Sequence, residues 1–446
     1  MMQEPLQPLS WLGIVRLGLV QAALGAIVVL TTSTLNRIMV VELALPAMLP
    51  GILVGLHYAM QVFRPRLGYG SDLGGRRTPW ILGGMALLAV GGVLAAVATA
   101  WMAAQLMAGI VLAALAFVMI GIGVGAAGTS ILVLLAERTD PSRRSAAASI
   151  AWIMMIAGFI VTTIAAGHAL DPYSGTRLIA VSSTVSVIAM LLAVVGLGNV
   201  EGDISRPELR TTTTGEASFA QGLMEVWTEP RARRFAIFIF VSMLAYSAQD
   251  LILEPFAGSV FGMTPGATTQ LSGLQHGGAL IGMILVPVIN ALVPSWRTQT
   301  TAWIIGGCIA SALALFSLAL AALVGPAWPL RLSVLALGVT NGVYAIAAIS
   351  AMMNLVDAGH RGRQGTRMGL WGASQAISFG IGGFLGTLAS DGARHVLSSP
   401  SLSYSLVFAT EAALFVLAAY LAVWIGTPLL RDAADGALPI PANQGA

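Results

Sequence analysis

Twelve apolar stretches of about twenty residues dominate this chain of 446 residues. A helix of about 20 mainly apolar residues is long enough to cross a bilayer, so each stretch predicts one membrane-spanning helix. The stretches cover residues 15–36, 43–63, 79–99, 106–136, 146–167, 178–198, 234–253, 271–293, 301–323, 330–353, 368–388 and 404–426. Only 9% of the residues are charged, against about 25% in an ordinary soluble domain. The sequence therefore predicts an all-α polytopic membrane protein with twelve transmembrane helices.

The arginines predict which way these helices run. All basic residues are arginine, and 18 of them lie in segments on the side of the N-terminus. The other side carries only four, which are Arg37, Arg177, Arg331 and Arg394. Because basic loops stay in the cytoplasm, both termini are expected to be cytoplasmic.

An internal repeat relates the two halves of the chain. The spacing from His57 to His276 equals the spacing from Trp152 to Trp371. Two six-helix pseudo-repeats joined by a long central loop are typical of the major facilitator fold, in which the substrate site lies near the midplane between the halves. The predicted units are an N-terminal half (1–198), a cytoplasmic central loop (199–233), a C-terminal half (234–426) and a cytoplasmic tail (427–446).

The central loop contains one amphipathic segment. Phe219, Leu223, Val226 and Trp227 recur at helical spacing, and a cluster of arginines follows them. Such a segment can lie on an anionic membrane surface as an interfacial helix. The alternative is a plain linker with one hydrophobic turn.

The loop between the second and third spans carries the most specific local motif. Gly68, Asp72, Gly75, Arg76 and Arg77 match the major facilitator loop pattern G-x-x-x-D-x-x-G-R-R. Glycines permit tight turns, and an aspartate can pair with an arginine or a helix N-terminus. The motif predicts a latch that biases a gate between two packings, although a purely topological polar turn remains the alternative.

Polar residues at the outer ends of the first and seventh spans are candidates for function, because ionisable groups inside a membrane are costly. They are Asn36, Arg37 and Glu42 in the first half, and Gln249, Asp250 and Glu254 in the second. Arg37 is expected to pair with Glu42, or with Asp250 or Glu254 across the halves. A water-exposed interfacial position is favoured for Glu42 and Glu254, and Arg37 and Asp250 stay open between the two interpretations.

Glu411 lies seven residues into the last predicted span. It is either a group for proton coupling or a residue at the outer headgroup level. Most other spans carry no charge in their middle third. This scarcity of buried charge disfavours a transporter of polar solutes and suits an apolar cargo.

His57 and His276 lie well inside spans, among glycines and apolar residues. A neutral imidazole with small neighbours can hold the Mg²⁺ of a flat chlorin ring. The alternative is a helix–helix hydrogen bond, which is a common use of an intramembrane histidine.

No pattern of catalytic chemistry appears in the sequence. There is no nucleophile with a matched base, no metal-ligand spacing and no phosphate-binding loop with a lysine. We therefore expect no enzyme, no metal site and no bound nucleotide. The net charge of +3 comes from arginines between apolar runs, so nucleic acid is not an expected partner. Membrane lipid is.

Several runs resemble the PucC family. These are Leu30–Leu43, Pro46–Gly51, Gly55–Gln61, Arg64–Gly68 and Arg76–Trp80, with looser matches at Leu274–Gly278 and Met368–Gly372. The family belongs to the major facilitator superfamily and occurs in phototrophic bacteria. The resemblance implies an assembly factor of the bacterial inner or intracytoplasmic photosynthetic membrane, which delivers bacteriochlorophyll to light-harvesting antenna polypeptides. It also implies pigment-synthesis enzymes as partners, and it favours the ligand role for His57 more than for His276.

Two other functions stay open. One is a secondary transporter of a small, largely apolar solute by alternating access, and the other is a scaffold that binds antenna proteins without pigment. For the assembly factor, the small-residue faces around Gly121–Gly128 and Gly380–Gly386, which predict helix packing, are also candidate contact surfaces for antenna helices.

Overall fold

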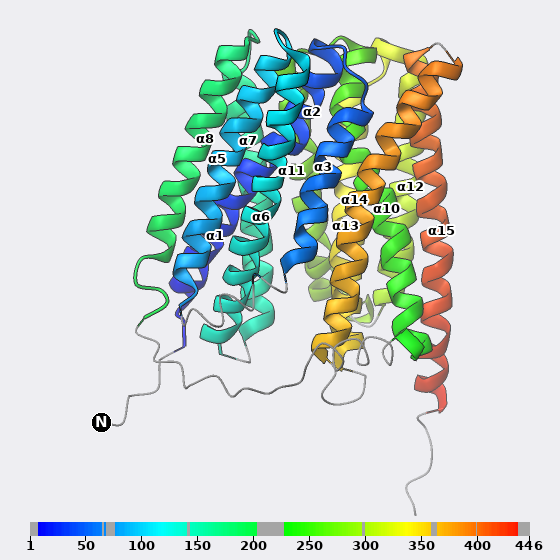
Figure 1. Ribbon diagram of the computed structural model, residues 1–446. Coiled ribbons are helices and arrows are strands. Elements are labelled where there is room, and N and C mark those ends of the chain that lie inside the picture. Colours follow the sequence, from blue (N-terminus) through cyan, green and yellow to red (C-terminus); the bar gives the residue numbers. More distant parts are fainter. Residues whose placement is uncertain are drawn as a thin grey trace, which may run out of the picture.

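The computed structural model describes residues 8–64, 67, 76–140, 143–202, 227–296, 299–357, 364–397 and 399–435. Figure 1 shows a bundle of long helices that run between two ends of the molecule. In the described residues, ten helices are long and apolar enough to cross a membrane. The chain is a multi-pass membrane protein.

The helices of the first half follow the predicted spans. They are α1 (Trp11–Val29), α3 (Met48–Met60), α5 (Thr78–Met102), α6 (Leu106–Arg138), α7 (Arg144–Ala169) and α8 (Gly175–Leu197). The first span continues beyond α1 through the π-helical turns η1 (Leu30–Thr34) and η2 (Ile38–Glu42), with α2 (Leu35–Arg37) between them. Helix α3, with 13 residues, is shorter than α1, α5, α6, α7 and α8.

The second half contributes six further helices. They are α10 (Pro230–Phe261), α11 (Pro265–Leu292), α12 (Thr300–Val324), α13 (Leu330–Asp357), α14 (Gln364–Leu397) and α15 (Pro400–Asp435). The predicted interfacial helix falls largely within residues 203–226, which lie outside the described residues.

The helices pack in the same pairs in both parts of the chain. Helix α1 packs against α7 and α8, α5 packs against α6 and α8, and α3 packs against α6. Correspondingly, α10 packs against α14 and α15, α12 packs against α13 and α15, and α11 packs against α13. Each set encloses its own apolar core. The two sets meet mainly through α3 with α14 and α7 with α11.

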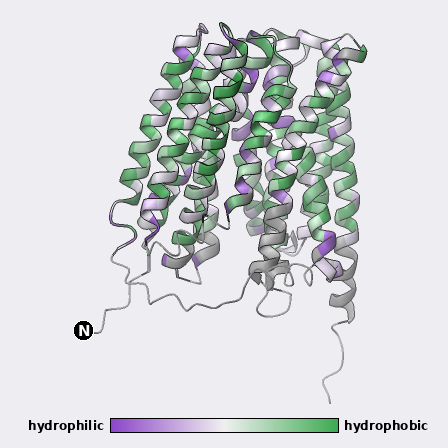
Figure 2. Cartoon of the chain, in the orientation of Figure 1, coloured by the Kyte–Doolittle hydropathy of each residue, from purple (hydrophilic) through white to green (hydrophobic). Residues whose placement is uncertain are grey.

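Glycines let several of these helices touch backbone to backbone. A Cβ on Gly282 of α11 would lie 2.0 Å from the Val339 carbonyl oxygen, and one on Gly342 of α13 would lie 2.0 Å from the Ala279 oxygen. Close approach through small residues is how membrane helices gain packing energy, because lipid supplies no hydrophobic drive between them. Hydrophobic residues make up most of the length of these helices (Figure 2).

The predicted small-residue faces also pack inside the bundle. Gly121 lies against the backbone of His57 in α3, and Gly382 and Gly386 lie against α10. The prediction of helix-packing faces is confirmed. The hypothesis that these glycines meet antenna helices is wrong, because the chain's own helices already occupy them.

The first and seventh helices extend beyond their predicted ends. The first span continues to Glu42, and α10 continues to Phe261. Asn36, Arg37, Asp250 and Glu254 therefore lie within helices and not at their ends. We call the end of the bundle that holds Glu42 the upper end, as in Figure 1, and the opposite end, where α1 begins, the lower end.

Candidate functional site

A buried polar network joins the first span to α10 and α11. Ser33 donates a hydrogen bond to Glu254 and lies 3.3 Å from the Ser272 hydroxyl. Beside it, Thr34 and Thr269 share a hydrogen bond of 3.1 Å, and the Asn36 amide donates to the Leu251 carbonyl oxygen. Ser33 and Thr34 belong to the π-helical turn η1, a geometry that often marks functional sites. The network ties the first helix of one half to two helices of the other.

Arg37 is the largest buried side chain of this network. Only 2% of it is exposed, its Nη1 lies 2.5 Å from Glu42 Oε1, and its Nη2 donates to the Met263 carbonyl oxygen over 2.7 Å. Arg37 therefore pairs with Glu42, which is one of the three partners that the sequence left open. Glu42 is part-exposed, as predicted. The water-exposed position predicted for Glu254 is wrong, because 1% of that residue is exposed.

An aromatic cluster from three helices lies near Asp250. The Tyr58 and Tyr246 rings lie 5.6 Å and 5.9 Å from the Phe379 ring, which brings α3, α10 and α14 together. Asp250 lies within electrostatic range of both tyrosines and faces the Gln275 amide of α11. The site combines flat apolar surfaces with one carboxyl group.

His276 has the geometry of a potential ligand. Its Nδ1 lies 2.8 Å from the Ser272 carbonyl oxygen, which makes Nδ1 the protonated nitrogen and leaves the Nε2 lone pair available. The side chain is part-exposed, and a Cβ built on the neighbouring Gly277 would meet no atom within 4 Å. Phe159 of α7 lies edge-on to the ring at 4.9 Å. Open space and a fixed tautomer are what an axial ligand of a metal in a flat ring requires.

His57 lies in a tighter place. Only 2% of the residue is exposed, and its Nε2 lies 3.0 Å from the amide nitrogen of Gln61, which directly follows α3. Helix α6 packs against its backbone at Gly121. Its Nδ1 has no hydrogen-bond partner among the described residues. A macrocycle at His57 would have to displace a packed helix, so the geometry favours His276 and reverses the order suggested by the resemblance.

Glu411 lies deeper than predicted. Helix α15 begins at Pro400, so Glu411 is a full three turns into the helix, and 2% of it is exposed. Neither of its carboxyl oxygens has a hydrogen-bond partner among the described residues. The interpretation as a headgroup-level residue is wrong.

The loop motif is described only at its end. Gly68, Asp72 and Gly75 lie outside the described residues, so the latch at Asp72 stays a prediction. At the start of α5 the carboxylate of Glu201 accepts from the backbone N–H groups of Arg77 (2.5 Å) and Thr78 (2.9 Å), and the Arg76 guanidinium lies 4.0 Å away. A carboxylate at a helix N-terminus is stabilised by the helix dipole. No sequence pattern pointed to Glu201, which follows α8.

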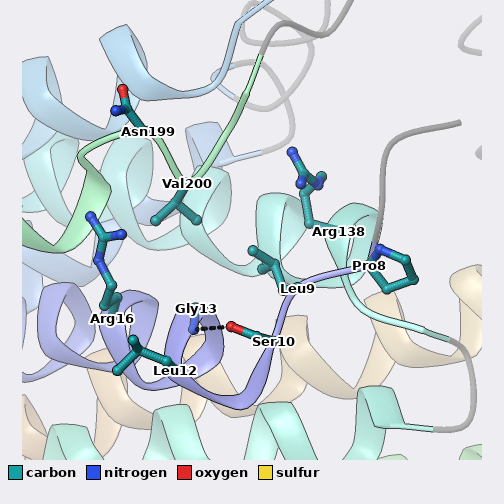
Figure 3. A pocket seen from close by; sticks show the side chains of 9 residues that line it. All are labelled: Pro8, Leu9, Ser10, Leu12, Gly13, Arg16, Arg138, Asn199 and Val200. Carbon is teal, nitrogen blue, oxygen red and sulfur yellow. Dashed lines mark hydrogen bonds between the residues drawn. The ribbon is translucent and has the colours of Figure 1, made fainter. Parts of the chain in front are cut away.

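A pocket of about 310 Å³ opens beside this contact, where α1 begins. Figure 3 shows that Arg16, Arg138 and Asn199 surround it, with Ser10 capping Gly13. Arg16 donates to the carbonyl oxygens of Val195 and Gly198, and Arg138 donates to that of Glu201. Arg16 therefore caps the end of α8, and Arg138 holds the segment that follows it. None of the predicted site residues lines the pocket.

Two aspartates close the upper end between the halves. Asp391 of α14 accepts from the backbone N–H groups of Ala47 (3.0 Å) and Met48 (2.7 Å), where α3 begins. Asp171, after α7, accepts from the Thr264 hydroxyl over 3.0 Å, where α11 begins. Neither aspartate was singled out from the sequence. Among the residues that the structure describes, no group of three or more His, Cys, Asp or Glu side chains is placed to hold a metal ion.

Solved structures share this fold. The nucleoside transporter NupG aligns over 93% of this chain and 99% of its own, with a TM-score of 0.66 and 15% identity. A D-xylose-proton symporter aligns over 92% and 96%, with a TM-score of 0.67 and 16% identity. At such low identity the likeness shows the fold alone, which is that of major facilitator transporters.

Sequence relatives extend over nearly the whole chain. A Rhodobacter capsulatus protein named bacteriochlorophyll synthase 44.5 kDa chain is 48% identical over 434 residues, which are 97% of this chain and 98% of the relative. Protein PucC of Cereibacter sphaeroides is 30% identical and covers 94% of this chain and 92% of its own. Residues 34–428 match the family described as PUCC protein. The chain therefore belongs to the PUCC family.

Proposed function

We propose that this protein is an assembly factor for photosynthetic light-harvesting complexes, which binds (bacterio)chlorophyll as cargo and delivers it to antenna polypeptides. The relatives carry names from bacteriochlorophyll synthesis and from PucC, and these names support a role in photosynthesis. The observation that carries the pigment step is His276, whose Nδ1 is held by the Ser272 carbonyl oxygen so that its Nε2 stays available, next to a glycine with no neighbour within 4 Å of a built Cβ.

The site fits the chemistry of such a cargo. The Mg²⁺ of a chlorin takes one axial ligand, and His276 offers a neutral imidazole whose tautomer is set by the Ser272 carbonyl oxygen. The rings of Tyr58, Tyr246 and Phe379 offer flat apolar surfaces. The protein's part is to bind and orient the pigment and keep it from water. It performs no bond-making step in this proposal, despite the word synthase in the name of one relative.

The architecture supports transfer within the membrane. The recurring helix pairs support two six-helix halves of the major facilitator type, with the site between them. The excess of arginines on one side supports an inner-membrane protein with both termini in the cytoplasm. Antenna polypeptides, membrane lipid and pigment-synthesis enzymes are the proposed partners.

An absorption spectrum tests the proposal. The protein, purified in mild detergent from a pigment-producing phototroph, is expected to carry a (bacterio)chlorophyll band at near one pigment per chain. The His276→Ala variant, purified in the same way, should lose the (bacterio)chlorophyll band. A pigment-free wild-type preparation from such cells contradicts the pigment step, and crosslinking to antenna polypeptides would then select the scaffold function.

A secondary transporter is the second candidate, and one observation favours it. Asp250, Glu254 and Glu411 lie inside helices, and this revises the view from sequence that the spans are nearly free of buried charge. Buried carboxyl groups in spans often mark ion or proton pathways. Solute-driven or proton-driven uptake in proteoliposomes that Asp250→Asn or Glu411→Gln abolishes would favour this function over pigment delivery.

A further inference from the structure

Besides Ser390 near the end of α14, four buried polar side chains in the second half have no hydrogen-bond partner among the described residues. They are Gln249 of α10, Ser311 of α12, Asn341 of α13 and Glu411 of α15. Each is at most 2% exposed. Leaving a polar group buried and unpaired costs about 1–3 kcal/mol, and more for a charged group. Four such residues in one half of the bundle require a common explanation.

All four belong to the core-facing stripes of their helices. Gln249 continues the buried series Phe238, Ser242, Ala245 of α10, at intervals of three or four residues. Asn341 and Glu411 fall on the buried faces that also carry Tyr344 and Phe415, since residues three or four apart share a helix face. The four helices pack against one another, α12 against α13 and α15, and α10 against α15 (Figure 1).

Contacts between aromatic residues bracket the four side chains from above and below. On the upper side Phe256 lies 5.0 Å from Phe408. On the lower side Tyr344 donates to Ser242 over 2.6 Å and lies 5.8 Å from Phe415.

The polar residues lie between these two contact layers. Glu411 follows Phe408 by three residues and precedes Phe415 by four, and Gln249 lies seven residues from both Phe256 and Ser242.

The same residues share one depth. The upper ends of their helices are Phe261 of α10, Val324 of α12, Leu330 of α13 and Pro400 of α15. Each polar residue lies a little over three turns from the upper end of its own helix. At a pitch of about 5.4 Å this is roughly 17–20 Å, near the middle of a hydrocarbon core of about 30 Å. The four side chains thus face one core at one level.

We propose that Gln249, Ser311, Asn341 and Glu411 form a binding site for one dehydrated monovalent alkali cation. The carboxylate, two amide oxygens and a hydroxyl offer an all-oxygen ligand set, which is the kind that hard cations prefer. One carboxylate balances one positive charge, whereas calcium sites collect several carboxylates. The cation supplies the partner that the buried oxygens lack, and Glu411 supplies the countercharge that the cation needs away from water.

The fold does not require such a group at this place. Helices α1, α5, α6 and α8 form the corresponding core of the first half. The last three carry no amide residue, and their only acid is Glu137, at the end of α6. Helix α1 carries Gln21, whose amide nitrogen lies 3.4 Å from the Met155 sulfur of α7. A cluster of one acid and two amides therefore occurs in the second half alone. A requirement of helix packing would place such a cluster in both halves, whereas a ligand site can occur in one.

The cation site lies beside the residues proposed to face the pigment. Asp250, next to Gln249, lies within electrostatic range of Glu411 and of Tyr58. A cation bound at Glu411 changes the charge that Asp250 experiences.

Salt-dependent melting tests the proposal. The whole protein in detergent is melted in choline chloride, sodium chloride and potassium chloride at equal ionic strength. Sodium or potassium is expected to raise the melting temperature by a few degrees over choline, and the rise should saturate with concentration. Glu411→Gln should abolish the rise, and Asn341→Ala should shift its midpoint to about tenfold higher salt. Glu254→Gln, which alters another buried glutamate, should keep the response.

Two results overturn the proposal. Equal melting temperatures of the wild type in all three salts would mean that water and a neutral Glu411 fill the cluster. A full response in Glu411→Gln would place the cation elsewhere. Binding of radioactive sodium to the wild type supplies a readout that does not depend on how well any variant folds. Neither result bears on pigment binding, so this proposal and the pigment proposal fail separately.

Discussion

Asp171 and Asp391 come from different halves of the chain and make equivalent contacts across the upper end of the bundle. Asp171 follows α7 and accepts one hydrogen bond from the Thr264 hydroxyl at the start of α11. Asp391 lies near the end of α14 and accepts from the backbone N–H groups of Ala47 and Met48 at the start of α3. A carboxylate at a helix N-terminus gains both from the hydrogen bonds and from the dipole. The two aspartates therefore hold the halves together at this end.

Removing these carboxylates should open the upper end. A capping side chain contributes about 0.5–2 kcal/mol, so Asp391→Ala should raise the open population roughly 2–30-fold. Asp171→Ala should have a smaller effect, because its contact is one hydroxyl bond. The measurement is maleimide labelling of Thr387→Cys, since Thr387 is buried against Gly51 and becomes reachable only on opening.

The chain suits this experiment. Its single natural cysteine, Cys308, is buried, so background labelling is low. Arg331→Ala, an exposed change at the same end, should leave the labelling rate unchanged. Unchanged labelling in Asp391→Ala and in the double variant would show that the aspartates do not hold this end closed.

The two intramembrane histidines should differ in their effect on bound pigment. His276→Ala removes the Nε2 that the Nδ1–Ser272 contact leaves available, and it should reduce the copurifying pigment at least tenfold. His57→Ala removes a packed side chain whose Nε2 already has a partner in Gln61, so it should change stability more than pigment content. Pigment-to-protein absorbance ratios, with melting temperatures of the same samples, check this. Equal losses in both variants would contradict the assignment to His276.

Adjacent glycines beside His276 provide a matched pair. A Cβ on Gly278 would lie 2.6 Å from the Leu335 carbonyl oxygen, whereas one on Gly277 meets nothing within 4 Å. Gly278→Ala should therefore push α11 away from α13 and lower stability by about 1–3 kcal/mol. Gly277→Ala should be neutral, or stabilising by up to about 1 kcal/mol, because alanine favours helix. Thermal melting in detergent distinguishes them, and similar melting of both variants would refute the predicted close contact.

The sequence predicted the positions of the spans well, but it predicted the burial of their polar residues poorly. Apolar runs of about twenty residues identify spans directly. Asn36 and Glu254 looked like the ends of such runs, because hydropathy cannot distinguish a residue facing water from one satisfied by a distant helix. Their partners, Leu251 and Ser33, lie 215 and 221 residues away in the chain.

The aspartate contacts at the upper end show a second limit. The partners of Asp391 are backbone N–H groups, which every residue except proline carries, so no residue type reveals them. Glu201 escaped notice for the same reason, because it binds the backbone of Arg77 and Thr78. For the histidines, the sequence found both candidates, but only the packing at Gly121 and Gly277 could rank them.

Arg37 should be a major contributor to the joining of the two halves. Its guanidinium contacts Glu42 and the Met263 carbonyl oxygen, and 2% of the side chain is exposed. Arg37→Met keeps much of the length but removes a hydrogen bond from a charged donor to the Met263 carbonyl oxygen, which contributes about 1.5–3 kcal/mol. Glu42 is part-exposed and can turn to water, so its loss of a partner adds little. Melting temperatures should fall by several degrees in Arg37→Met and stay unchanged in Arg331→Met, whose arginine is exposed. An Arg37→Met protein that melts like the wild type would show that these contacts do not stabilise the bundle.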